Sequence, residues 1–143
     1  MSKISILHLI TRLIVGGAQE NTMYTAALLD PTRYAVEVIS GPQTGSEGSL
    51  IEELRARGVA LTILPELVRE VHLRNDWVAL WKLYRRMRAG HYTIVHTHSS
   101  KAGILGRLAA KLAGVPVIVH TVHGWSFHDY MSPLVRAVYV LLE

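Results

Sequence analysis

The chain has 143 residues, half of them hydrophobic, so it has enough apolar material for one domain with a core and is not expected to be disordered. It contains no cysteine, which excludes a disulfide scaffold and thiolate metal sites and is typical of a reducing cytoplasm. The net charge of +4 is modest, and no stretch reaches the roughly 18 uninterrupted apolar residues of a membrane span. The first apolar stretch is broken by His8, Thr11 and Arg12, unlike a signal peptide, so we expect a cytoplasmic protein.

Short apolar runs rich in β-branched residues alternate with helix patterns along the whole chain. Glycines and prolines such as Pro31, Gly58, Gly90 and Gly114 separate them. In chain order the predicted elements are a strand at 4–10, helix 18–29, strand 35–40, helix 50–57, strand 59–64, a helix from Asn75 or Asp76 to about 89, strand 92–96, helix 101–113, strand 115–122, and a helix from Ser132-Pro133 to Glu143. This alternation predicts a doubly wound, Rossmann-like parallel sheet covered by helices on both faces.

Ligands of open parallel sheets bind at the carboxyl ends of the strands. The segments expected there are 11–19, 41–49, 97–101 and 123–130, which are polar and rich in glycine and histidine. Gly16 and Gly17 open a helix, so backbone amides at its N-terminus could face an anion. The GxGxxG pattern is absent, which disfavours a dinucleotide site, and a tight turn alone would also explain the glycine pair.

Histidines follow the fourth and fifth predicted strands. His96 and His98 lie on the same side of their strand, and such a pair can bind zinc if further ligands complete the site. The candidates for these further ligands are His120, His123, His128 and Asp129. Because parallel strands often bury a hydrogen-bonded histidine, we expect no metal.

His123 and His120 lie on opposite faces of the fifth strand, so they cannot share one role. His123 is followed by Gly124 at the strand end and is the better candidate for a ligand contact, whereas we expect His120 to pack inside. No G-x-S-x-G motif, P-loop or pair of carboxylates at the strand ends is present, which disfavours hydrolases and kinases.

The helix near residues 75–89 combines cations with a face formed by Trp77, Leu80, Trp81, Tyr84 and Met87. One interpretation is a surface helix that buries its tryptophan face on the sheet. The other is a patch that contacts anionic lipid at the inner face of the membrane through Arg74, Lys82, Arg85, Arg86 and Arg88. No nucleic-acid contact is expected, since no base-reading module accompanies the charge.

Three segments, 10–21, 94–107 and 119–125, together resemble the N-terminal domain of glycosyltransferase family 4, a group of retaining, metal-independent enzymes with the two-domain GT-B fold. The resemblance implies that a second domain, which has no counterpart in residues 1–143, binds most of the nucleotide sugar, and that this domain binds the acceptor. It matches Gly16 and Gly17 to the loop near the donor phosphates and His123 to a catalytic histidine near the transferred sugar. It assigns the acceptor side of the cleft to Arg12, Thr97, His98, Lys101 and Gly124.

The resemblance implies hexosyl transfer from a nucleotide sugar to a lipid-linked or glycan acceptor, with retention of configuration, in cell-envelope polysaccharide synthesis. No cofactor beyond the nucleotide sugar is expected, and the domain alone should be inactive. One alternative is a GT-B sugar-nucleotide epimerase, which needs acidic groups in the cleft that the strand ends do not show. The other is a non-catalytic Rossmann-like binding domain. The last predicted helix argues against it, because that helix reaches residue 143 without a terminating signal.

Overall fold

The computed structural model of the chain describes residues 2–43, 45–124 and 131–142. Its sheet has five strands in the order β3-β2-β1-β4-β5, and every neighbouring pair is parallel. The strands are β1 Ile4–Ile10, β2 Tyr34–Ser40, β3 Ala60–Ile63, β4 Ile94–His98 and β5 Val117–Thr121. The doubly wound Rossmann-like fold predicted from the sequence is confirmed.

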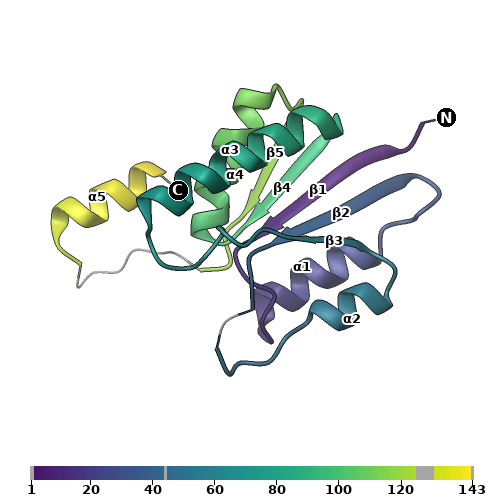
Figure 1. The fold of residues 1–143 in the computed structure, drawn as a ribbon, viewed down its shortest axis with the longest axis horizontal. Coiled ribbons are helices and arrows are strands. Elements are labelled where there is room, and N and C mark those ends of the chain that lie inside the picture. The colour runs from purple at the N-terminus through teal and green to yellow at the C-terminus, as the bar shows by residue number, and fades with distance from the viewer. Residues whose placement is uncertain (1, 44, 125–130, 143) are drawn as a thin grey trace.

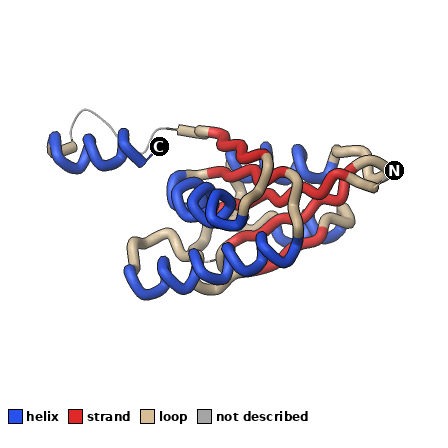
Figure 2. The backbone as a smooth tube through the Cα atoms, turned by 90° about the horizontal axis from the view of Figure 1, so that it is seen from above, coloured by secondary structure: helices blue, strands red, loops and turns tan. Residues whose placement is uncertain are grey.

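Helices cover both faces of this sheet. The helices that do so are α1 Gly17–Ala27, α2 Ile51–Ala56, α3 Leu73–Gly90 and α4 Ser100–Ala113, and a fifth helix, α5 Pro133–Leu142, follows β5 in the chain. In Figure 1, α1 and α2 lie on one face and α3 and α4 on the other. α5 stands apart from the sheet, as Figure 2 shows from above. Glu143, to which the last helix was expected to run, lies outside the described residues.

The central strand β1 explains why two cores form. Its side chains alternate between the faces, so Leu7 and Leu9 join the core under α3 and α4, while Ile10 joins the core under α1 and α2. All three are fully buried. A strand buried on both faces reads as a nearly continuous apolar run, which is the pattern of residues 4–10 apart from Ser5 and His8.

Several predicted boundaries differ from the structure, and those of β4 and α3 bear on the site. β4 ends at His98 rather than His96, because pairing with β5 continues through Thr97 and His98. α3 begins at Leu73, before the predicted Asp76 cap. The Asp76 carboxylate accepts a hydrogen bond from the His72 N–H at 3.1 Å, so it caps the first turn from inside the helix.

The interpretation that α3 buries its tryptophan face on the sheet is also wrong. α3 instead buries Ala79, Leu83 and Met87, a stripe at four-residue spacing, while Trp77 is 71% and Trp81 58% exposed. Ala79 is small enough for close helix packing, which the indole rings are not. The two tryptophans are therefore left exposed, while Leu80 and Tyr84 of the same face are partly buried against the core.

Among the described residues, β5 is an edge strand, and Val117, Ile118 and Val119 remain 36–44% exposed. Leu134 and Leu141 of α5 are likewise exposed. No helix within the described ranges is long and apolar enough to cross a membrane.

Candidate functional site

Because all five strands run the same way, their carboxyl ends meet at one edge of the sheet. A hydrogen bond of 2.8 Å between the hydroxyls of Thr11 and Ser99 joins the ends of β1 and β4 there. Ser99 has φ 63°, an uncommon conformation for a residue with a Cβ, and it directs the chain into α4. The Ala102 N–H in turn donates to the Thr11 hydroxyl at 3.3 Å. These hydrogen bonds join the ends of β1 and β4 to the first turn of α4.

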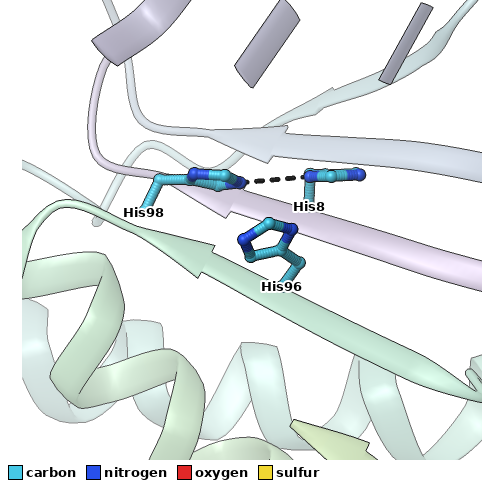
Figure 3. A group of neighbouring side chains, drawn as sticks. All are labelled: His8, His96 and His98. Carbon is cyan, nitrogen blue, oxygen red and sulfur yellow. Dashed lines mark hydrogen bonds between the residues drawn. The ribbon is translucent and has the colours of Figure 1, made fainter. Parts of the chain in front are cut away.

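Histidines from β1, β4 and the end of β5 meet beneath this edge. His8 pairs with His96 in the β1–β4 register, so their side chains share one face of the sheet, and His98 follows two residues later. His8 Nδ1 lies 3.1 Å from His98 Nε2 (Figure 3), and His98 Nδ1 lies 3.1 Å from His123 Nε2. His96 Nε2 is 2.7 Å from the Thr121 hydroxyl. We call His8, His98 and His123 the histidine chain.

Burial keeps the histidine chain neutral. His8 is 1% and His98 0% exposed. Burial, aided by neighbouring histidines, lowers the pKa of His8 to about 4 and that of His98 to about 2. Burial also lowers the pKa of His123, whose residue is exposed at the surface. Each ring therefore offers one N–H donor and one bare acceptor near neutral pH.

His8, His96 and His98 are also close enough to be tested as a metal site, with ligand nitrogens within 4.8 Å of one another. Two of these nitrogens, His8 Nδ1 and His98 Nε2, already face each other at hydrogen-bond distance. Among the described residues no carboxylate joins the group, so a buried dication would lack a counter-charge. His128 and Asp129, the further candidate ligands, lie outside the described residues, and His120 lies on the opposite face, where its Nδ1 is 2.9 Å from the Thr97 hydroxyl.

Three of the residues assigned to the acceptor side of the cleft make contacts within the domain in this structure. Thr97 is fully buried, and its hydroxyl donates to the Val119 carbonyl at 3.2 Å. His98 is the buried middle of the histidine chain. Lys101 forms an ion pair of 2.6 Å with Asp76, which joins α4 to α3.

Of the remaining predicted residues, Gly17 and Gly124 are exposed at the strand edge, whereas the Arg12 side chain is only 13% exposed. Arg12 forms an ion pair of 3.4 Å with Glu47. A Cβ built on Gly17 or Gly124 would meet nothing within 4 Å, so both leave open space for a ligand. Gly16 caps α1 without a side-chain hydrogen bond, so the first amides of that helix have no side-chain acceptor from their cap.

Sequence reasoning missed His8 as part of the site. Within the run 4–10 it is the one imidazole, and it shares a face of that strand with Ile10, which belongs to a core. A polar residue in that position must find a hydrogen-bond partner, and this signal could have drawn attention to it. Its partner is 90 positions away in the sequence, and no local pattern identifies it.

The parallel sheet defines a Rossmann-like α/β domain, and its polar carboxyl edge is where ligands of such sheets bind. The model of the family described as glycosyl transferase 4-like domain matches residues 16–143. The chain therefore belongs to that family, and the resemblance seen in the sequence is confirmed.

A relative from Escherichia coli, UDP-Gal:alpha-D-GlcNAc-diphosphoundecaprenol alpha-1,3-galactosyltransferase, is 40% identical over 145 residues. The match covers 99% of this chain and 35% of that enzyme, so the chain spans about a third of its relative's length.

Two solved structures share the fold at low identity. MurG from Acinetobacter baumannii has a TM-score of 0.65 at 17% identity, covering 99% of this chain and 39% of its own. A putative UDP-N-acetylglucosamine 2-epimerase from Listeria monocytogenes has a TM-score of 0.66 at 14% identity, covering 99% and 38%. At this level of identity the two structures show the fold alone, and the fold does not by itself determine an activity.

Proposed function

We propose that the chain is the N-terminal, acceptor-side domain of a two-domain glycosyltransferase that moves a hexosyl unit from a nucleotide sugar to a lipid-linked acceptor. The observation that carries the proposal is the 40% identity, over 99% of the chain, to a transferase whose name gives UDP-galactose as donor and a diphosphoundecaprenol-linked sugar as acceptor. The epimerases match at 14–17% identity, a level at which only the fold is shared. We extend the role to cell-envelope polysaccharide synthesis on the same ground.

The division of labour between two domains is part of this proposal. The chain forms one sheet with two cores and matches 35% of its relative, the share that one domain of a larger enzyme would cover. A second domain would hold most of the donor, and the chain alone would turn nothing over, because the reactants would not be held together. Transfer would proceed with retention of configuration, and neither a metal nor a resident cofactor would take part.

The surface groups of the strand edge support the roles given to them. The open space at Gly17 and the amides that begin α1 suit a donor phosphate. His123 stands at the end of β5, where its Nε2 meets His98, and among the described residues its Nδ1 has no hydrogen-bond partner, which leaves that atom for a ligand. A neutral imidazole can bond a sugar hydroxyl without adding charge. Arg12 and Gly124 complete the acceptor side of the edge, which Thr97, His98 and Lys101 support from beneath.

The proposal is tested by a transfer assay on the full-length protein. Sugar label supplied as UDP-galactose should pass from the aqueous phase to a lipid diphosphate that carries N-acetylglucosamine. Incubation without the lipid is the control, and it should leave the nucleotide sugar unchanged rather than epimerised.

Peripheral attachment to the inner face of the membrane is the second part of the proposal. The exposed aromatic face of α3 continues onto α4, and the two helices form an apolar hollow lined by Trp77, Leu80, Trp81, Tyr84 and Leu112. We call these residues the aromatic patch. Exposed tryptophans beside cations suit the boundary between lipid headgroups and acyl chains. The name of the E. coli relative includes a lipid-linked acceptor, and this supports a membrane-binding surface on the chain.

The structure divides the five cations expected to contact lipid. Arg86 pairs with Glu37 at 2.8 Å and Lys82 with Glu66 at 2.5 Å, so their charges are largely neutralised. Within the described ranges, Arg74 and Arg85 form no ion pair, and Arg88 donates to the Ala113 carbonyl at 3.4 Å. We therefore assign the attraction to anionic lipid to Arg74, Arg85 and Arg88.

Replacing both tryptophans, Trp77→Ser with Trp81→Ser, should weaken binding to anionic vesicles by about tenfold or more, because two large apolar side chains no longer enter the interface. Vesicle sedimentation at low and high salt measures the effect. Leu28→Ser is the matched control, since Leu28 is 76% exposed at the C-cap of α1, the helix that covers the other face of the sheet. Equal sedimentation of the wild type with neutral and anionic vesicles at low salt would contradict membrane attachment through this helix.

A further inference from the structure

We infer that His8 and His98 fix the tautomer of His123, so that His123 presents its Nδ1–H as a hydrogen-bond donor at the strand ends. The consequence for catalysis rests on the proposed function, whereas the tautomer itself can be measured without any activity. The inference gives a positioning role to two buried histidines that contact no ligand.

The geometry couples the three rings. His98 Nε2 faces His8 Nδ1 and His98 Nδ1 faces His123 Nε2, each at 3.1 Å. A neutral imidazole has one N–H and one bare nitrogen, and each contact needs one of each. The histidine chain therefore has two states, in which either all three rings carry the proton on Nδ1 or all three carry it on Nε2. The tautomer of His8 thus determines the tautomer of His123.

The buried end of the histidine chain selects between these states. His8 is 1% exposed, and its Nε2 has no hydrogen-bond partner among the described residues. In the Nε2 state this atom would be a buried N–H without an acceptor, an orphan that folded proteins avoid more strictly than a bare acceptor. The Nδ1 state leaves a bare nitrogen there instead. His123 then accepts from His98 at Nε2 and carries its own proton on Nδ1.

The same buried end argues against proton transport along the histidine chain. A proton passed inward from His123 through His98 would stop at His8, because His8 Nε2 leads to no further group in the described structure. Burial also lowers the pKa of both inner rings, which disfavours a charged intermediate. Orientation of His123 is the role that this geometry supports.

The test is nitrogen-15 NMR of the full-length protein labelled at histidine, with the His8, His98 and His123 signals assigned by single substitutions. Two-bond proton–nitrogen correlations distinguish the two neutral tautomers, and the wild type near pH 7.5 should show Nδ1–H at all three rings. His8→Phe should turn the His123 signal into a mixture of tautomers and lower kcat about tenfold, with little change in the donor KM. His98→Asn, whose amide can still donate toward His123, should keep more of kcat than His98→Leu.

His96→Gln is the matched control, because His96 lies on the same face of β4 but outside the histidine chain. It should leave the His123 tautomer unchanged. An Nε2–H tautomer at His123 in the wild type overturns the inference. This measurement uses the wild-type protein, so it does not depend on whether the variants fold. One equivalent of zinc that abolishes the correlations of His8 and His98 would also overturn it, because the rings would then form a metal site. A correct tautomer in a protein without transferase activity would instead refute the proposed function alone.

Discussion

His123→Ala in the full-length enzyme should lower turnover by about tenfold to more than a hundredfold. The imidazole stands at the end of β5 beside open space at Gly124, where a sugar hydroxyl can reach it. Loss of one hydrogen bond that leaves a buried partner unpaired costs about 1–3 kcal/mol, and the rate falls by the corresponding factor if the contact tightens in the transition state. Steady-state kinetics with the proper donor and acceptor measure this effect.

His120→Ala is the matched control for this experiment. His120 lies on the opposite face of β5, 2.9 Å from the Thr97 hydroxyl, and Gly103 of α4 packs against its ring. Its removal should lower the melting temperature and leave turnover of the folded enzyme close to normal. If His123→Ala retains near-normal turnover, His123 has a structural role and its assignment to the reaction is wrong.

Lowering the pH from 7 to 5 should lower the free energy of unfolding of this chain by about 2–4 kcal/mol. Burial lowers the pKa of His8 to about 4 and that of His98 to about 2, below the value near 6.5 of an unfolded histidine. The unfolded state therefore binds more protons below pH 6.5, and stability is lost as the pH falls, by up to about 1.4 kcal/mol per pH unit for each histidine. The contribution of His8 stops changing below about pH 4.

Urea unfolding at several pH values measures this slope. His8→Leu removes one of the two buried groups and should reduce the slope, whatever its effect on stability at pH 7. His72→Gln, at an exposed position, should keep the slope of the wild type. An unchanged slope in His8→Leu would show that His8 is not held neutral by burial.

The sheet was predictable because its signals are local. Each strand is a short apolar run, and glycines such as Gly58 and Gly114 adopt the left-handed conformation that ends the preceding helix or turn. The opposite faces of His120 and His123 also followed from two-residue alternation alone. What failed was the end of β4, because pairing with β5 extends that strand by two residues and no local pattern records such pairing.

The orientation of α3 could not be predicted from its hydrophobic residues. Two stripes compete on this helix, one aromatic and one formed by Ala79, Leu83 and Met87, and the tertiary partner selects the smaller side chains. The histidine chain was hidden for a related reason, since His8 and His98 are far apart in the sequence and meet only because β1 and β4 are neighbours in the sheet. The strand ends were therefore predictable as the candidate site, whereas the contacts beneath them were not.

The anomeric configuration of the product formed by the full-length enzyme tests the central claim most directly. With UDP-galactose and a lipid diphosphate acceptor that carries N-acetylglucosamine, proton NMR of the purified product should show a new α-linked galactose, with one UDP released for each sugar transferred. A β-linked product would contradict retention. A nucleotide sugar that is epimerised without any transfer to lipid would contradict the assignment of this chain to a glycosyltransferase.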